Sequence, residues 1–159
     1  MKPKAIMNWS GGKDSALALH AVLQANDYEV VGLLTTVNEV YGRISMHGVR
    51  EELLDQQAAA IGLPLIKIYL PEQSPMEIYD QIMRRHLEPL VVQGVTHAIF
   101  GDIFLEDLRR YREKRLAEVG LQAVFPLWQK STTQLAQDFV AQGFCAITVC
   151  TNEKQLDQS

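Results

Sequence analysis

One short run of residues has the composition of a phosphate-binding loop: Ser10, Gly11, Gly12, Lys13, Asp14 and Ser15. The two glycines remove side chains, so backbone N–H groups can approach an anion closely, and the two serines add hydroxyl donors. A helix that begins directly after the run would also direct the positive end of its dipole toward the anion. Lys13 would place a charge on a phosphate oxygen, and Asp14 would hold a Mg²⁺ ion that bridges phosphates. The run therefore predicts nucleotide binding, with Lys13 and Asp14 as catalytic candidates.

A plainer interpretation is that the glycines only form a turn and that Asp14 only caps a helix. The position of the run favours phosphate binding, because it lies between a predicted strand and a predicted helix, where open parallel sheets bind their ligands. Two other nucleotide motifs are excluded. The Walker loop requires Ser or Thr directly after Gly-Lys, where this chain has Asp14, and the dinucleotide pattern G-x-G-x-x-G is absent.

Asp102 is a further catalytic candidate, because it comes directly after a predicted strand and Gly101. A carboxylate at the end of a strand that neighbours the first one would face the same crevice as the loop, where it would bind a metal ion or hydrogen-bond an acceptor. The alternative is that Asp102 only begins the turn into the next helix.

Two groups of charged residues are candidates for binding a substrate. Arg109, Arg112 and Glu113 share one face of a predicted helix, where a guanidinium would suit a carboxylate, although such a row is also typical of a surface ion pair. His47 and Arg50 begin another helix, next to a segment (39–45) that we expect to be mobile and able to close over a nucleotide. A cap or a surface position is an equally open interpretation for His47.

Short apolar runs alternate with helical patterns along nearly the whole chain. This alternation predicts a doubly wound α/β fold with a mostly parallel sheet of about five strands and helices on both faces. The expected strands are 5–9, 30–37, 65–70, 96–100, 122–125 and a final one at 144–149, and the expected helices are 14–25, 50–61, 76–92, 106–119 and 132–141. Cys145 and Cys150 fall in or beside the last strand, so we expect both to be buried small hydrophobes rather than reactive thiols.

Length and charge limit the class of protein. The 159 residues suit one domain, for which we expect residues 1–150, followed by a polar tail at 151–159. The net charge of −4 argues against a broad nucleic-acid-binding surface, because phosphate neutralisation requires clustered Lys and Arg. No apolar run approaches the roughly 20 residues of a membrane span, and no signal-peptide pattern is present, so we predict a cytoplasmic protein without a membrane partner.

The run from Ser10 to Ser15 resembles the pyrophosphate-binding loop of the N-type ATP pyrophosphatases, which have the adenine nucleotide alpha hydrolase-like (HUP, Rossmann-like) fold. The resemblance implies that ATP is cleaved to AMP and pyrophosphate, with Mg²⁺ as cofactor, while an acceptor is adenylated. It also assigns Thr35 and Gly101 to the nucleotide site, Thr35 at the strand end where the superfamily binds adenine through backbone groups.

Motifs along the rest of the chain narrow the resemblance to the diphthine–ammonia ligase family. They follow in order as Met46-His47-Gly48-Val49-Arg50, Gly62-Leu63-Pro64, Phe100-Gly101-Asp102-Ile103, Arg109 with Glu113, Gly120-Leu121 and Pro126-Leu127-Trp128. The resemblance implies a ligase of diphthamide biosynthesis that adenylates a carboxylate and then forms an amide with ammonium. It places Arg109 and Glu113 near the acceptor, which would be a modified histidine on elongation factor 2 if the chain is archaeal or eukaryotic.

Two other functions stay open at this point. Another PP-loop enzyme, such as a transfer-RNA thiolase or tRNA-modifying ligase, would require a basic face or an added RNA-binding domain. A non-catalytic ATP-binding module would bind ATP without releasing pyrophosphate. Members of the family that the chain resembles continue past its last residue, so we expect the tail 151–159 to be either a frayed end or the start of a C-terminal segment. If an apolar edge is left there, a second copy of the chain could cover it, which would give a homodimer.

Overall fold

The computed structural model describes residues 1–149, and these form a sheet whose main strands run parallel. The parallel strands are β1 (Lys4–Asn8), β2 (Glu29–Asn38), β4 (Leu65–Leu70), β5 (Val95–Ile99) and β6 (Gln122–Val124). In space they follow the order β4-β2-β1-β5-β6, so the chain starts at the middle of the sheet and builds outward to both edges. This order confirms the predicted doubly wound α/β fold.

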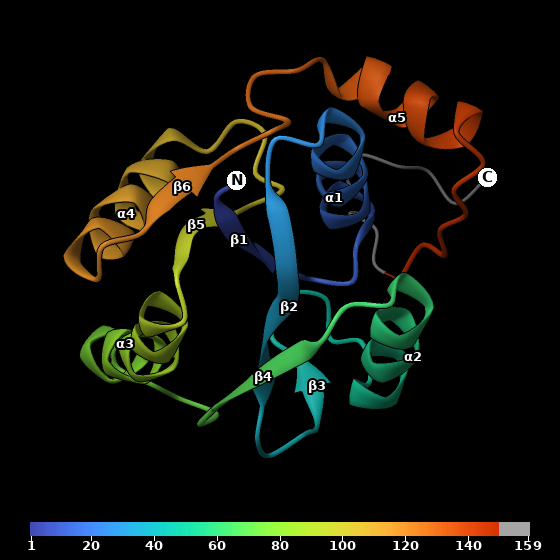
Figure 1. The fold of residues 1–159 in the computed structure, drawn as a ribbon. Helices are drawn as coiled ribbons and strands as arrows, with labels where there is room; N and C mark the ends of the chain where they lie inside the picture. The colour runs from blue at the N-terminus through green and yellow to red at the C-terminus, as the bar shows by residue number, and fades with distance from the viewer. Residues whose placement is uncertain (150–159) are drawn as a thin grey trace.

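Five helices cover the two faces of this sheet. They are α1 (Lys13–Ala25), α2 (Glu51–Ile61), α3 (Met76–Val92), α4 (Glu106–Glu118) and α5 (Thr132–Ala141). Helices α1, α2 and α5 lie on one face, and α3 and α4 lie on the other (Figure 1). Because successive strand residues point to opposite faces, β1 buries Ala5 and Met7 against the first group of helices and Ile6 against the second.

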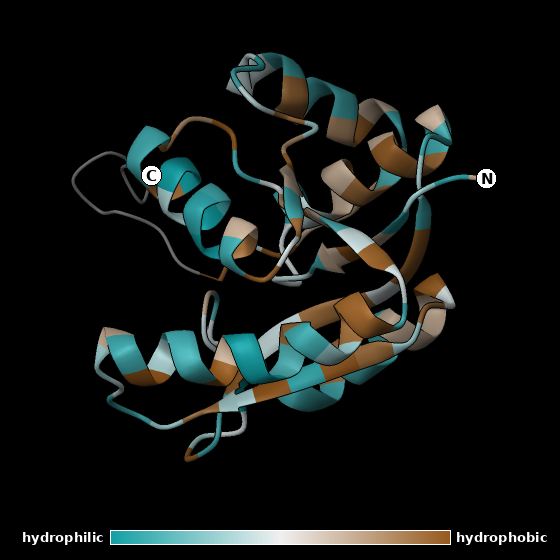
Figure 2. Ribbon diagram, turned by 60° about the vertical axis from the view of Figure 1, so that its left-hand side comes forward, coloured by the Kyte–Doolittle hydropathy of each residue, from teal (hydrophilic) through white to brown (hydrophobic). Residues whose placement is uncertain are grey.

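The sequence explains why the strands lie inside and the helices outside. Central strands are buried on both faces, as Leu33 and Leu34 of β2 show, and therefore read as continuous apolar runs. The helices alternate hydrophilic and hydrophobic residues along their length, as Figure 2 shows, so that each buries one side only. Among the described residues, no helix is both long enough and apolar enough to cross a membrane.

The segment that we expected to be mobile contains a short strand instead. β3 (Arg43–Ile44) pairs antiparallel with Val37 and Asn38 at the end of β2. Ile44 fixes this hairpin, because its side chain is 2% exposed and packs in the core beside α1 and α2. Gly42, with φ +59, provides the left-handed backbone conformation at the turn.

The expected final strand at 144–149 is wrong, because these residues form no regular structure. Their apolar, β-branched composition gives a propensity for strand, but a strand also needs a neighbour to pair with, and none of the described strands lies beside this segment. Only Phe144 is anchored, stacked on Phe139. Cys145 is exposed, which corrects its predicted burial, whereas Cys150 and the predicted tail 151–159 lie outside the described residues.

Candidate active site

A cavity of about 480 Å³ opens where β1, β2 and β5 end. At this point β1 connects to α1 on one face of the sheet, and its neighbour β5 connects to α4 on the other face, which makes this the switch point where doubly wound sheets bind ligands. The predicted site residues that line the cavity are Ser10, Asp14, Ser15, Thr35, His47, Gly101, Asp102 and Arg112. The structure thus brings together residues from widely separated parts of the sequence.

Hydrogen bonds between the two serines shape the loop between β1 and α1. The Oγ atoms of Ser10 and Ser15 lie 2.7 Å apart, and the Ser15 Oγ also accepts a hydrogen bond of 3.1 Å from the Ser10 N–H. Gly11 has φ +78, a conformation that favours glycine. Gly12 is the N-cap of α1, and no side chain caps this helix, so the N–H groups of its first turn are available to an anion.

Two glycines allow other elements to approach this loop closely. A Cβ atom on Gly12 would lie 2.6 Å from Nε2 of His47, so this predicted substrate-binding residue packs directly against the start of α1. His47 lies in the turn after β3 and not at the start of a helix as expected, because α2 begins only at Glu51. A Cβ atom on Gly101 would lie 3.0 Å from the backbone carbon and oxygen of Asp14. Gly101 therefore brings the end of β5, and with it Asp102, against the loop.

The side chains of the loop suit a nucleotide that carries Mg²⁺ better than they suit a metal ion bound by protein side chains alone. Asp14 pairs with Lys13 (Nζ to Oδ1, 2.7 Å), and both side chains are accessible to solvent. The described residues contain no group of three or more His, Cys, Asp or Glu side chains arranged to hold a metal ion. One carboxylate beside a phosphate-binding loop suits Mg²⁺, which is usually bound through one or two carboxylates together with substrate oxygens and water.

Thr35 offers an unused hydrogen-bonding group to a ligand. Its side chain is 2% exposed, and its Oγ1 has no hydrogen-bond partner among the described residues. Because an unpaired buried hydroxyl is unfavourable, a ligand that bonds to it gains affinity. This observation supports the assignment of the end of β2 to the nucleotide.

Asp102 and Arg112 form an ion pair in the wall of the cavity. The Nε atom of Arg112 donates to Oδ2 of Asp102 over 2.6 Å, and the two side chains are 20% and 18% exposed. The guanidinium also stacks on the ring of Phe100, with 4.4 Å to its centroid. This pair places one negative and one positive charge beside the loop, between the nucleotide end of the cavity and α4.

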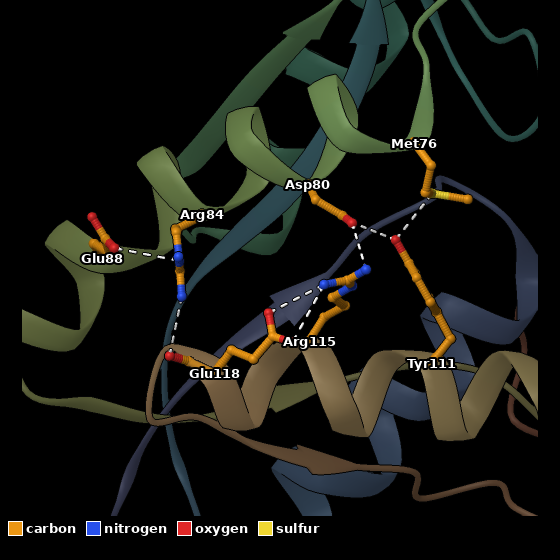
Figure 3. A network of polar contacts seen from close by, with 7 residues as sticks. All are labelled: Met76, Asp80, Arg84, Glu88, Tyr111, Arg115 and Glu118. Atoms are coloured by element: carbon orange, nitrogen blue, oxygen red, sulfur yellow. Dashed lines mark hydrogen bonds and ion pairs between the residues drawn. The ribbon is translucent and has the colours of Figure 1, made fainter.

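A polar cluster between α3 and α4 forms the other end of the cavity (Figure 3). Asp80 on α3 accepts hydrogen bonds from the Tyr111 hydroxyl (2.5 Å) and from Nη2 of Arg115 (2.9 Å), both on α4. Burial and the hydrogen bond to Asp80 raise the pKa of Tyr111 to about 12, so its hydroxyl stays protonated. Sequence analysis missed this cluster, because each member looks like an ordinary helix surface residue until α3 and α4 are placed side by side.

Three predicted substrate-binding residues lie elsewhere. Arg109 pairs with Glu113 over 3.0 Å and lies 4.7 Å from the ring centroids of both Phe125 and Trp128, outside the residues that line the cavity. Arg50 precedes α2 and lines a separate surface hollow. The substrate-binding role of Arg50, Arg109 and Glu113 stays a prediction.

The sequence Ser10-Gly11-Gly12-Lys13-Asp14-Ser15 at the switch point of a doubly wound sheet is the arrangement of the PP-loop proteins, which have the adenine nucleotide alpha hydrolase-like fold. The sequence family described as diphthamide synthase N-terminal domain matches residues 3–123. The chain therefore belongs to this family. Comparison with the sequences of curated proteins gave no match.

Two solved structures show the same fold. A predicted subunit of a tRNA methyltransferase from Methanocaldococcus jannaschii superimposes with a TM-score of 0.55 at 18% identity, covering 84% of this chain and 74% of that one. The U34-tRNA thiolase NcsA from Methanococcus maripaludis superimposes with a TM-score of 0.51 at 18% identity, covering 95% of this chain and 61% of that one. This chain thus spans less than two thirds of the thiolase, and at this identity the likeness concerns the fold alone.

Proposed function

We propose that the chain is a ligase that binds ATP in this cavity, cleaves it to AMP and pyrophosphate, and uses the energy to convert a carboxylate into an amide with ammonia. The observation that carries the proposal is the shared cavity. It is lined by Ser10, Asp14 and Ser15 of the phosphate-binding loop, by the Asp102–Arg112 pair and by the cluster between α3 and α4, whereas Gly11, Gly12 and Lys13 lie outside its lining. A nucleotide and a second substrate therefore have room to lie side by side, as transfer between them requires.

In the proposed reaction a carboxylate oxygen of the acceptor attacks the α-phosphorus of ATP, and the bond to the bridging oxygen breaks, so that pyrophosphate leaves. The N–H groups at the start of α1, together with Lys13, stabilise the charge that develops on pyrophosphate. When bound, Mg²⁺ would be held by Asp14 with phosphate oxygens and would neutralise phosphate charge. Ammonia then attacks the acyl carbon, AMP leaves with the bonding electrons, and the nitrogen loses a proton to give the amide.

The acceptor would occupy the part of the cavity between α3 and α4. Arg112 lies nearest to the loop through its contact with Asp102, and Arg115 follows one turn farther along α4, beside Asp80. Because the two guanidiniums follow one another away from the phosphates, an acceptor bound along them would direct its reacting carboxylate toward the α-phosphate.

The decisive experiment analyses the products of ATP labelled at the α or γ phosphate, with Mg²⁺, ammonium and a cell extract as the source of acceptor. We expect acceptor-dependent AMP and pyrophosphate from the wild type and loss of both in Asp14→Ala. Asp27→Ala is the matched control, because Asp27 is an exposed aspartate just past the far end of α1. Release of ADP alone, or ATP binding without turnover, would rule out the ligase reaction and favour the non-catalytic binding module.

A tRNA-modifying enzyme is the second candidate function. It stays open from the sequence, and the two solved structures that share the fold are both tRNA-related proteins. Addition of total tRNA in place of the cell extract separates the two, since only a tRNA-modifying enzyme would then release AMP and pyrophosphate.

A further inference from the structure

Gln57 on α2 connects the phosphate-binding loop to the core through its side-chain amide. Its Oε1 accepts a hydrogen bond of 3.0 Å from the indole Nε1 of Trp9, and its Nε2 donates one of 3.2 Å to the backbone carbonyl of Gly11. Both contacts are partly buried, and Trp9 is 6% exposed. Leu54 and Ala58, on the same helix, are buried in the core and fix the position of Gln57.

The chemistry of the two partners determines the residue type that suits this position. An indole N–H only donates and a backbone carbonyl only accepts, so the group between them must accept on one side and donate on the other. A carboxamide does both from one planar carbon. An ionised carboxylate at the same place would still accept from Trp9 but would face the Gly11 oxygen with a second negative oxygen.

The bond to Gly11 also determines where the next N–H points. The Gly11 carbonyl and the Gly12 N–H belong to one planar trans peptide and so point in opposite directions. While Gln57 holds the carbonyl toward α2, the Gly12 N–H faces the interior of the loop, where it donates a hydrogen bond of 3.3 Å to the Ser10 Oγ. Gly11, with its φ of +78, has no side chain to resist rotation of this peptide, so an external contact is needed to fix it.

We propose that Gln57 is a positioning residue for pyrophosphate binding: it holds the Gly11–Gly12 peptide with its N–H directed at the anion. This inference rests on the proposed function in naming ATP and pyrophosphate as the ligands. Its geometric part, the fixed orientation of the peptide, concerns the chain without ligand. Gln57 does not line the cavity and would act only through the loop.

The test is Gln57→Glu, with affinity for MgATP and for inorganic pyrophosphate measured by calorimetry at about pH 8 and about pH 5. The introduced carboxylate should weaken binding at least tenfold at the higher pH. The Gly11 oxygen disfavours the ionised form of the introduced acid and so raises its pKa above the usual value of about 4.3. At the lower pH the protonated acid again donates to Gly11, so most of the affinity should return. Gln56→Glu is the matched control, because it adds the same charge to the same helix on an exposed neighbour and should bind like the wild type at both values.

Other groups near the loop also titrate or carry charge, namely His47 against Gly12 and the Lys13–Asp14 pair. They are present in all three proteins, so the difference between Gln57→Glu and wild type reports on position 57. Equal affinity of the two at the higher pH would overturn the proposal. A loss that does not recover on acidification would also overturn it, because that result would mean a packing role.

A measurement without ligand tests the positioning role of Gln57 independently of the proposed ligase function. In NMR spectra of the unliganded chain, the Gly12 amide and the Trp9 indole N–H should shift with pH in Gln57→Glu beyond the shifts seen in wild type and in Gln56→Glu. If wild type binds neither ATP nor pyrophosphate, the proposed function fails, and the Gly12 resonance still decides the orientation of the peptide. An unchanged Gly12 amide in Gln57→Glu would overturn the inference.

Discussion

At the end of β5, Gly101 packs so closely against the backbone of Asp14 that an added Cβ atom would force this backbone to shift. Gly101→Ala would place a methyl group 3.0 Å from two backbone atoms, which cannot move aside as a flexible side chain would. We expect this variant to lower the melting temperature and to weaken ATP binding at least tenfold, because the loop must shift. Calorimetry and thermal unfolding measure the two effects.

Gly62→Ala is the control for Gly101→Ala. Gly62 caps α2 with φ +81, and an added Cβ there meets nothing within 4 Å, so the substitution adds only backbone strain. It should cost about 1 kcal/mol of stability and leave ATP affinity unchanged. If both variants bound ATP equally well, the contact between Gly101 and the loop would have no part in binding.

The Asp102–Arg112 ion pair should contribute to the stability of the protein. Asp102→Asn leaves the Arg112 guanidinium without its counter-charge, and both side chains are at most one-fifth exposed. We expect the free energy of unfolding to fall by about 1–2 kcal/mol, less than for a fully buried pair because solvent still reaches the site. Adding Arg112→Met should recover part of that loss, as measured by denaturant unfolding. Additive effects of the two substitutions would show that the charges do not interact.

Which site residues could be predicted depends on how local their signal is. The loop from Ser10 to Ser15 is recognisable because its glycines, hydroxyls and charges are consecutive. Gln57 reads as one polar position of an amphipathic helix, since its partners lie 48 and 46 residues away in the sequence. Contacts between distant elements depend on how the helices pack on the sheet. The pattern of neighbouring residues in the sequence does not contain this information.

Helices α3 and α4 are joined through Tyr111, and this contact should make stability sensitive to alkaline pH. The pKa of Tyr111 is raised to about 12, first by burial and then by its hydrogen bond to Asp80. A raised pKa in the folded state stabilises the protein fully below the unfolded value of about 10, and this contribution is lost as the pH rises toward 12. Tyr111→Phe should therefore flatten the decline of the unfolding free energy across this range, measured by denaturant titrations at several pH values.

The stability of Tyr111→Phe at neutral pH provides the internal reference. The variant loses the hydrogen bond to Asp80, which still accepts from Arg115, so a modest loss of about 1 kcal/mol is expected there. An identical alkaline slope in wild type and variant would mean that the Tyr111 hydroxyl ionises alike in the folded and unfolded states.

The sequence pattern predicted those helices and strands whose formation depends on their own residues. The bounds of α3 and α5 match the expected ranges, because their helical periodicity extends over the whole element and Pro89 comes too late in α3 to end it. The segment 144–149 has strand composition without a strand partner, and β3 pairs although only two residues long. Both differences arise from pairing, a property of the neighbours rather than of the segment itself.

Over the whole molecule, basic side chains are largely matched by acids. The chain has 15 Lys and Arg against 19 Asp and Glu. Along α4, Arg109, Arg110 and Arg112 each pair with a carboxylate within 3.4 Å. The most arginine-rich helix therefore presents much less positive charge to a partner than its sequence suggests.

This balance of charge predicts that the chain does not bind tRNA by itself. Binding a polyanion requires cations free to replace counterions, and arginines that already pair with carboxylates gain little from phosphates. We expect no binding of total tRNA at physiological salt by fluorescence anisotropy, and only weak binding at low salt. Affinity at physiological salt that fell steeply with added salt would contradict this expectation. It would show a phosphate-binding surface and shift the proposed acceptor from a carboxylate to a nucleic-acid base.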